Sequence, residues 1–319
     1  MLSAQILQVR NIVEAFDRKV GFLLIRKNRR SFSIVIIYAV LFIGSLIMFY
    51  PFLFQVLASL GTDSDYYRAV IVPIPTELRI DRYVDVFSQP TVYRLFLNTI
   101  FRCIWFILVT TVVSMFGGYV FSKLRFKGKN AIFVMFLSSM MIPEQVRLLP
   151  HYLILARWPG MGGNNWLGQG GHGMIDSWAA LLIGGLVPVY FIFLMKQMME
   201  SLPYEYEEAS RIDGAGTLRI IFGIYMPMVK PMLATIFILA FIGTWNDYLL
   251  PLIVISSPEK NVIATGMASL MSMRNIPGNL PKYPFIFTLA TIAIMPPILV
   301  YLSLQKYFVQ GFAMSGIKG

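Results

Sequence analysis

The sequence predicts an all-α integral membrane protein, with six transmembrane helices preceded by an interfacial helix. The 319 residues are 57% apolar and only 13% charged, which lies outside the range of ordinary soluble domains. Several apolar runs reach the roughly 20 residues needed to cross a hydrocarbon core. Because helices satisfy their own backbone groups inside lipid, these runs are predicted to be helices and not strands.

The N-terminal segment, residues 1–32, is basic and precedes the first long apolar run. Its apolar residues recur every three or four positions, which is the spacing of one helix face. They are Ile6, Val9, Val13, Phe16, Val20 and Leu23. A basic amphipathic helix suits the surface of an anionic membrane leaflet. A helix packed on a partner subunit fits the pattern equally well.

A transmembrane domain is predicted over residues 33–308 and is followed by a short tail, 309–319. Prolines interrupt two of its spans, since Pro143 and Pro150 lie in the third and Pro188 kinks the fourth. The six predicted spans are 33–56, 95–122, 130–156, 175–199, 231–255 and 284–305.

Lys and Arg are shared unevenly between the loops. They gather in the N-terminal segment, the loops around 123–129 and 196–230, and the tail, and they are sparser in the longer opposite loops. Because cytoplasmic loops carry the excess of positive charge, both termini are predicted to be cytoplasmic. The net charge of +11 is therefore assigned to topology, and no nucleic-acid partner is expected. The glycine-rich loop 157–174 then lies outside and is expected to be irregular.

Residues for catalysis or ATP hydrolysis are missing from the sequence. The nearest approach to a phosphate-binding loop, at 127–130, lacks the first glycine and the final Ser or Thr. No H-E-x-x-H motif occurs, and the single cysteine, Cys103, excludes a cysteine-based metal site. The chain is expected to be a non-catalytic transport subunit that binds no cofactor and no metal.

The loop 201–227 carries the signals of a short helix at the membrane surface. Pro203 suits a first helical turn, and Glu207 and Glu208 favour the positive end of the helix dipole. Gly214 can end the helix. On composition alone, a plain solvated connection is the alternative.

The same loop resembles the coupling loop of ABC importer permeases. Glu208-Ala209-Ser210, three residues, Gly214, nine residues, Ile224, one residue and Met226-Pro227 follow the pattern E-A-A-x3-G-x9-I-x-L-P, with Ser210 for Ala and Met226 for Leu. In that family the loop forms a helix that docks in a cleft of the ATPase subunit. The implied ATPase-coupling residues are Glu207, Glu208, Ala209, Ser210, Asp213, Gly214, Ala215 and Pro227.

Three further stretches resemble sugar permeases of the maltose-transporter (MalG-like, type I importer) family, and the similarity runs from about residue 30 to the end. They are GYVFSKLRFKGK at 118–129, FIGTWNDYLLPLIV at 241–254 and QKYFVQGFAMSGIKG at 305–319. The resemblance implies a heterodimer with a second homologous permease subunit, a dimer of ATP-binding subunits that use ATP and Mg, and an extracellular solute-binding protein. The outer loop at about 256–284 would reach into the sugar cleft of that protein. The implied ATPase contacts of the tail are Ser315, Gly316, Ile317, Lys318 and Gly319.

A sugar path through lipid needs polar groups and aromatic faces within the spans, where polar residues are costly. The candidate residues for the substrate path are Trp245, Asn246, Asp247, Tyr190, Gln145 and Glu144. Structural roles are the alternatives: Glu144 could pair with Arg147 on one helix face, Asp247 could accept hydrogen bonds from a neighbouring helix, and Trp245 could be ordinary packing. Arg102 is expected to extend toward the outer interface.

The sequence does not decide which solute is transported. The resemblance implies an oligosaccharide, while an acidic (uronide) oligosaccharide or a glycerophosphodiester suits the same scaffold. An ion-coupled secondary transporter would often show inverted repeats, and no such halves are visible. A membrane-bound enzyme would need a catalytic set. We therefore expect a permease of an ATP-driven, binding-protein-dependent sugar importer in the bacterial cytoplasmic (inner) membrane.

Overall fold

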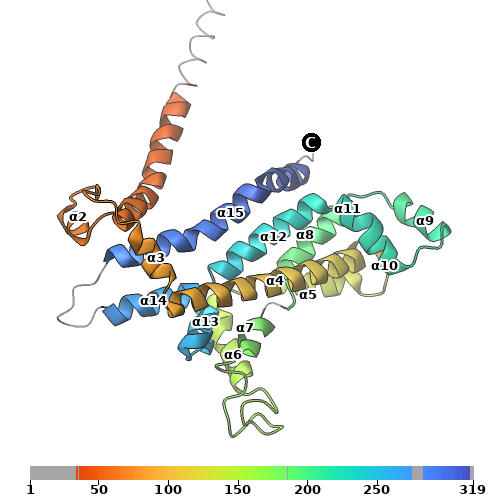
Figure 1. The fold of residues 1–319 in the computed structure, drawn as a ribbon. Coiled ribbons are helices and arrows are strands. Elements are labelled where there is room, and N and C mark those ends of the chain that lie inside the picture. Colours follow the sequence, from red (N-terminus) through yellow and green to blue (C-terminus); the bar gives the residue numbers. More distant parts are fainter. Residues whose placement is uncertain (1–33, 35, 185, 275–282, 317–319) are drawn as a thin grey trace, which may run out of the picture.

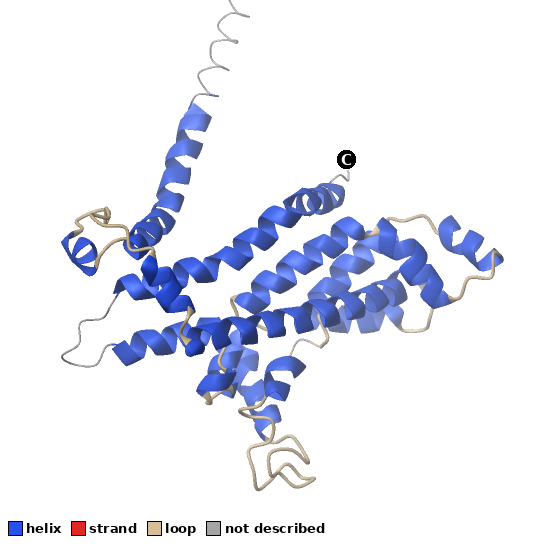
Figure 2. Cartoon of the chain, in the orientation of Figure 1, coloured by secondary structure: helices blue, strands red, loops and turns tan. Residues whose placement is uncertain are grey.

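A computed structural model describes residues 34–316 except 35, 185 and 275–282 (Figure 1). The predicted interfacial segment 1–32 and the last three residues of the tail lie outside the described residues. Every regular element of the part described is helical (Figure 2), so the all-α prediction is confirmed.

The helices follow one another along the chain. After a first helix at Ile36–Leu60 come α2 (Asp63–Arg68), α3 (Asp81–Phe87), α4 (Pro90–Lys123), α5 (Lys129–Ser139), α6 (Glu144–Ala156), α7 (Trp178–Ile183), α8 (Val189–Glu200), α9 (Glu205–Ile212), α10 (Thr217–Ile220), the π-helical turn η1 (Ile221–Tyr225), α11 (Met226–Met228), α12 (Lys230–Trp245), α13 (Leu249–Val254), the 3-10 turn η2 (Pro258–Lys260), α14 (Ile263–Arg274) and α15 (Tyr283–Gly316). The glycine-rich loop separates α6 from α7.

Three predicted spans are single helices that are long and apolar enough to cross a membrane: Ile36–Leu60, α4 and the Tyr283–Lys306 part of α15. Each differs at its ends from the predicted range. α4 begins at Pro90, which suits the first helical turn because its missing N–H would have no partner there. α15 continues to Gly316, so most of the predicted tail extends the last helix.

The other three predicted spans are divided. The interruption predicted for the third is present, the fourth is divided where only a kink at Pro188 was predicted, and the division of the fifth was not predicted. α5 and α6 meet at 98° across 140–143, and together they pass the length and composition test for a span. The predicted helix 175–199 is divided into α7 and α8, and Pro188 stands at the N-cap of α8. A proline disfavours helical geometry in the residue before it, which accounts for the break.

The predicted fifth span, 231–255, is also divided. α12 ends at Trp245, and a turn at 246–248 leads into α13. At its start, α12 forms a bent pair with Thr217–Met228, at 84°. Counting each bent pair as one span gives up to five spans by length and composition among the described residues. The turn exposes backbone and polar side chains within a membrane-spanning segment, which is tolerated where they line a cavity.

α4 is the central helix, and it packs along α8 and α12, while α12 also packs on α15 (Figure 1). The contact with α8 is close because of two glycines. A Cβ atom built on Gly118 would lie 2.4 Å from Met195 Cγ, and one on Gly117 would lie 2.9 Å from Ile192 Cγ2. These distances are below any real contact, so the two helices can approach only where α4 lacks side chains.

The two ends of α4 contact different segments. Near its first residues, Asn98 donates hydrogen bonds of 2.8 Å to the carbonyl oxygens of Glu259 and Asn261. Near its last turns, Tyr119 contacts Glu207 of α9. The α9 helix and the segment after α13 therefore lie toward opposite ends of one long helix.

The Ile36–Leu60 helix stands apart from the rest (Figure 1). Its most apolar stretch has a mean hydropathy of 2.2 and no buried residue. Contacts with α15 occur near its end, where Phe54 packs edge-on against Phe287 and Gln55 Nε2 donates to Thr291 Oγ1. Its outer surface is suited to lipid or to another membrane helix.

Candidate functional site

α9 is a short helix whose end is set by Gly214. Gly214 has φ 78°, the left-handed conformation that glycine adopts without steric cost. The chain then turns back, and the amide of Ala215 donates to the carbonyl of Ser210 at 2.9 Å. The predicted helix over this loop and its end at Gly214 are both present in the structure.

Glu207 is buried, with 1% of its surface exposed, and it joins α9 to the membrane-spanning helices. Its Oε1 accepts hydrogen bonds from the Tyr119 hydroxyl of α4 at 2.8 Å and from Arg211 Nη2 at 2.7 Å. Its Oε2 accepts one from the Tyr225 hydroxyl of η1 at 3.2 Å. We call Glu207, Tyr119, Tyr225 and Arg211 the Glu207 cluster.

Apolar packing encloses Glu207, Tyr119 and Tyr225, whereas Arg211 is exposed at the edge of the Glu207 cluster. Tyr119 and Tyr225 belong to a core of methionine and isoleucine side chains from α4, α8, α10, η1 and α12. Arg211 forms an ion pair with Glu207 one helical turn away and also donates to the Tyr119 hydroxyl oxygen at 3.0 Å. The hydrogen bond to Glu207 raises the pKa of the Arg211 guanidinium above its usual range. Hydrogen bonds to a charged group contribute about 1.5–3 kcal/mol each, so the cluster holds α9 firmly against α4.

The other predicted coupling residues lie mostly on the opposite, exposed side of the loop. Glu208, Ala209, Asp213 and Gly214 are exposed, whereas Ser210 and Ala215 are half-buried. Ile212 is 86% exposed at the end of α9. Pro227 lies in α11, after the π-helical turn. An acidic, partly apolar surface thus faces away from the membrane helices that Glu207 contacts.

The predicted tail contacts are only partly described. Ser315 and Gly316 form the last turn of α15. Ile317, Lys318 and Gly319 lie outside the described residues, and no side-chain contacts are described for the end of this helix.

A cavity of about 1040 Å³ lies among α4, α6, α8 and the turn between α12 and α13. Four of the predicted path residues line it: Glu144, Tyr190, Asn246 and Asp247. The structure therefore brings together residues from three predicted spans. Gln145 is exposed and does not line the cavity.

Trp245 also does not line this cavity. It is 4% exposed, its ring stacks on Phe241 with centroids 5.4 Å apart, and its indole Nε1 donates to the carbonyl of Ala293 at 3.1 Å. Trp245 is therefore a packed residue of the core, which is the alternative to a substrate-path role given in the sequence analysis. Glu144 and Arg147 both line the cavity, and no ion pair joins them within the described residues.

Arg102 does not extend to the interface, so that prediction is wrong. It is 2% exposed, and its Nη2 donates to Asp247 Oδ2 at 2.5 Å. Its guanidinium carbon lies 5.3 Å from the centroid of the Phe106 ring. A buried arginine needs a counter-charge, and Asp247 supplies it. Asp247 thus accepts a hydrogen bond from a neighbouring helix, which is the structural alternative given for it, and it also lines the cavity.

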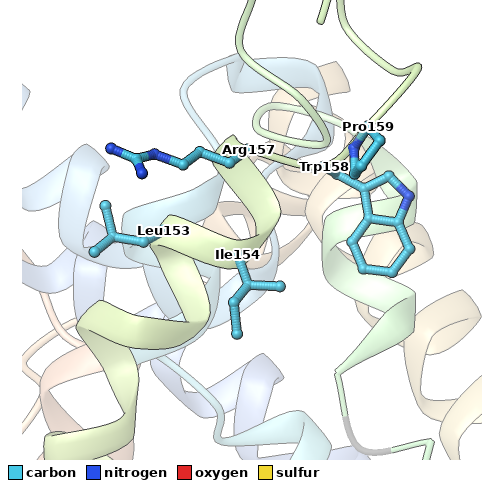
Figure 3. A pocket seen from close by; sticks show the side chains of 5 residues that line it. All are labelled: Leu153, Ile154, Arg157, Trp158 and Pro159. Carbon is cyan, nitrogen blue, oxygen red and sulfur yellow. The ribbon is translucent and has the colours of Figure 1, made fainter. Parts of the chain in front are cut away.

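A smaller, open and mostly apolar pocket of about 470 Å³ lies at the end of α6 (Figure 3). It is lined by Leu153, Ile154, Arg157, Trp158 and Pro159, and it borders the glycine-rich loop. Asn164 holds this loop by donating to the carbonyl oxygens of Ala156 and Trp158 at 2.9 and 3.1 Å. Arg157 is the charged residue that lines this pocket, and the pocket is open, so we assign no solute site to it.

These features are those of a multi-pass membrane protein: helices long and apolar enough to cross a membrane, a cavity with charged residues in its wall, and a short acidic helix fastened to the central helix. The family model for the inner membrane component of binding-protein-dependent transport systems matches residues 20–314. The chain belongs to this family.

Curated relatives cover most of both chains. The arabinooligosaccharides transport system permease AraQ of Bacillus subtilis is 30% identical over 86% of this chain and 92% of its own. The lactose permease LacG of Rhizobium radiobacter is 26% identical, covering 89% and 96%. The sn-glycerol-3-phosphate permease UgpE of Rhizobium meliloti is 27% identical, covering 89% and 97%.

A solved structure shares the fold. A chain of a bacterial ABC transporter that imports the acidic polysaccharide alginate superposes with a TM-score of 0.74. It is 24% identical in sequence, and the match covers 88% of this chain and 97% of that one. The type I importer permease fold expected from the sequence is thereby confirmed.

Proposed function

We propose that this chain passes an oligosaccharide across the cytoplasmic membrane as one permease subunit of an ATP-driven importer, with both termini cytoplasmic. The family assignment supports the permease role, and the names of AraQ and LacG support a sugar as the solute. The distribution of Lys and Arg supports the orientation. The Glu207 cluster carries the mechanical part of the proposal, because it links an exposed acidic helix to the membrane core.

The proposed assembly contains a second, homologous permease subunit, two ATP-binding chains and an extracellular solute-binding protein. ATP and Mg²⁺ are bound by the ATP-binding chains, and this chain contributes no cofactor site. The exposed side of α9, with Glu208 and Ala209, contacts an ATP-binding chain, and the end of α15 contacts the same layer. The outer loop at about 256–284 faces the solute-binding protein.

The Glu207 cluster explains how motion of the ATP-binding chains would be coupled to the membrane helices. When the ATP-binding chains close, they displace α9, and the Glu207 cluster moves the last turns of α4 and η1 with it. Separating these groups would leave a buried carboxylate without partners, which costs several kcal/mol. α4 also carries Arg102 on the wall of the cavity. Motion applied at α9 thus reaches the cavity through one continuous helix.

The decisive experiment is uptake by the reconstituted complex after reversing the charge at Glu208. Glu208→Arg should abolish ATP-driven uptake while the complex still inserts and retains its fold. Glu200→Arg, a reversal at an exposed glutamate on α8, is the matched control and should transport normally. Uptake unaffected by Glu208→Arg would remove the coupling role. Uptake by this chain alone, driven by an ion gradient, would instead establish a secondary transporter.

A second solute class has support of its own. UgpE is named for an anionic solute, sn-glycerol 3-phosphate, and it covers as much of this chain as the sugar permease LacG does. The cavity of this chain contains cationic groups, which a path for strictly neutral sugars does not require. An acidic oligosaccharide or a glycerophosphodiester is therefore the second candidate.

A further inference from the structure

We propose that Arg102 is an anion-recognition residue of the translocation cavity, and that it selects solutes carrying a carboxylate or phosphate group. This inference rests on the proposed permease function and narrows its substrate class. It assigns Arg102, which the sequence places in a long apolar helix, a direct role toward the solute.

The Arg102 guanidinium has donors that are not used. Its Nη1 has no hydrogen-bond partner and is enclosed from solvent. Nη2 donates to Asp247, and Nε has only a long contact of 3.4 Å with the carbonyl of Leu181. An arginine is always charged and presents five N–H donors, so an unpaired nitrogen in a buried site carries a real cost.

By contrast with Arg102, the buried carboxylates Glu207 and Asp65 have both of their oxygens hydrogen-bonded. Both Glu207 oxygens accept hydrogen bonds. Both Asp65 oxygens do so as well, from Thr62 and Thr76. Among the described residues, only Arg102 Nη1 and Ser114 Oγ are buried side-chain atoms without a hydrogen-bond partner. The incomplete pairing of Arg102 therefore suggests that another acceptor binds there during transport.

The surroundings of Arg102 suit such an acceptor. Arg102 and its partner Asp247 both line the cavity, and the Asp247 side chain is 20% exposed. Arg147 and His151 face the same space, as does the carboxylate of Glu144. Asp247 is the more exposed partner of the pair, so it is the group that a solute anion would displace from Arg102, and the anion then supplies the counter-charge of the guanidinium.

A neutral sugar would gain less at this site. Charge-assisted hydrogen bonds are roughly twice as strong as neutral ones, and arginine can hold a carboxylate or phosphate through two parallel bonds. The structural alternative is a simple tie between α4 and the turn after α12. A tie predicts that removing either partner is equally harmful and that exchanging the two residues restores the protein.

The test measures binding to the purified, reconstituted complex without ATP. The probes are trigalacturonate, maltotriose and glycerol 3-phosphate, and the variants are Arg102→Gln, Arg102→Lys, Asp247→Asn and the exchange Arg102→Asp with Asp247→Arg. Arg79→Gln is the control, because Arg79 is also paired with an aspartate, Asp81, but does not line the cavity. We expect an anionic probe to bind at least roughly tenfold more tightly than maltotriose, a difference that Arg102→Gln removes and Asp247→Asn retains.

Each outcome decides the proposal. Arg102-dependent binding of trigalacturonate identifies a carboxylate, and the same result with glycerol 3-phosphate alone identifies a phosphate. The proposal is overturned if the wild type prefers neither anion over maltotriose, or if both single variants fail alike and the exchange restores binding. Arg102→Lys keeps the charge, so it carries the test if Arg102→Gln does not assemble. ATP-driven uptake by the same wild-type sample shows separately whether the permease function stands.

Discussion

The carboxylate of Glu207 in α9 accepts a 2.8 Å hydrogen bond from the hydroxyl of Tyr119 in α4, a residue 88 positions earlier in the chain. This contact connects a helix outside the membrane core to the last turns of the central helix. Neighbouring Glu208 is exposed and makes no such contact with the core. Two adjacent glutamates therefore have different surroundings, one buried and one exposed.

Replacing Glu207 should uncouple and destabilise the protein. Glu207→Ala leaves Arg211, Tyr119 and Tyr225 without their shared acceptor, which we expect to cost about 3–5 kcal/mol and to lower the melting temperature of the complex. Uptake should fall more than ATP hydrolysis, because force applied to α9 no longer reaches α4. Glu208→Ala, at an exposed position, should leave the melting temperature unchanged. Full uptake by Glu207→Ala would contradict the proposed linkage.

Gly214 should not tolerate a side chain, although space is available. A Cβ at this position has no atom within 4 Å, so the cost comes only from its φ of 78°. We expect Gly214→Ala to destabilise the end of α9 by about 1 kcal/mol and to reduce uptake, with Gly214→Asn less affected. Gly216→Ala is the matched control, since that residue is also unobstructed and has φ −71°. Equal uptake by the Gly214→Ala and Gly216→Ala variants would show that the left-handed turn is not needed.

Gly118→Ala should destabilise the protein because space is lacking, whereas at Gly214 space is available. Here a Cβ would lie 2.4 Å from Met195 Cγ and 3.1 Å from the Met195 backbone, so α4 and α8 would have to separate. Overpacking of this kind typically costs about 1–3 kcal/mol, and we expect a matching loss of thermal stability. Gly44→Ala, on the first helix with no atom within 4 Å, is the comparison. A normal melting temperature for Gly118→Ala would show that the helices can move apart freely.

The hydrogen bonds that join Asp176, just before α7, to the segment 256–260 should depend on pH. Hydrogen bonds from the Ser257 hydroxyl and backbone, and from Lys260, hold the pKa of the Asp176 carboxyl well below its usual range. A depressed folded-state pKa gives stability that is fully present above the unfolded value of about 3.9 and is lost as the pH falls through the folded value.

The measurement is hydrogen exchange of segment 256–260 in wild type and Asp176→Asn. Protection should differ between the two proteins above about pH 4 and converge as the pH is lowered further. Asparagine tolerates the positive φ of 57° at this position, so backbone strain does not confuse the comparison. A difference that does not vary with pH would show that the charge of Asp176 is not what holds the loops.

Local patterns in the sequence predicted most of the helices and the position of α9. Apolar runs are properties of contiguous residues, and a proline, acidic residues and a glycine at fixed spacing define a short helix. The division between α7 and α8 and the turn at 246–248 were missed because Pro188 can either kink or break a helix, and the turn after Trp245 has no proline at its start. Composition does not distinguish these outcomes.

Contacts between distant segments could not be read from the sequence. Arg102 and Asp247 are 145 positions apart, and only packing shows that they meet. The sequence signal for this contact was one arginine and one aspartate in two apolar spans, because charged residues inside a membrane usually pair with one another. The different surroundings of Glu207 and Glu208 follow from helical phase: Glu207 faces the core, and Arg211, one turn later, reaches back to pair with it.

The Ile36–Leu60 helix is attached to the remaining helices chiefly near its end, at Phe54 and Gln55. Its preceding turns contribute nothing to the interior of this chain. Membrane insertion and internal packing are therefore separable properties of the polypeptide. A foreign apolar helix of equal length grafted before Phe54 would leave the cavity and the Glu207 cluster intact, and any loss of activity would then report on neighbours in the assembled transporter.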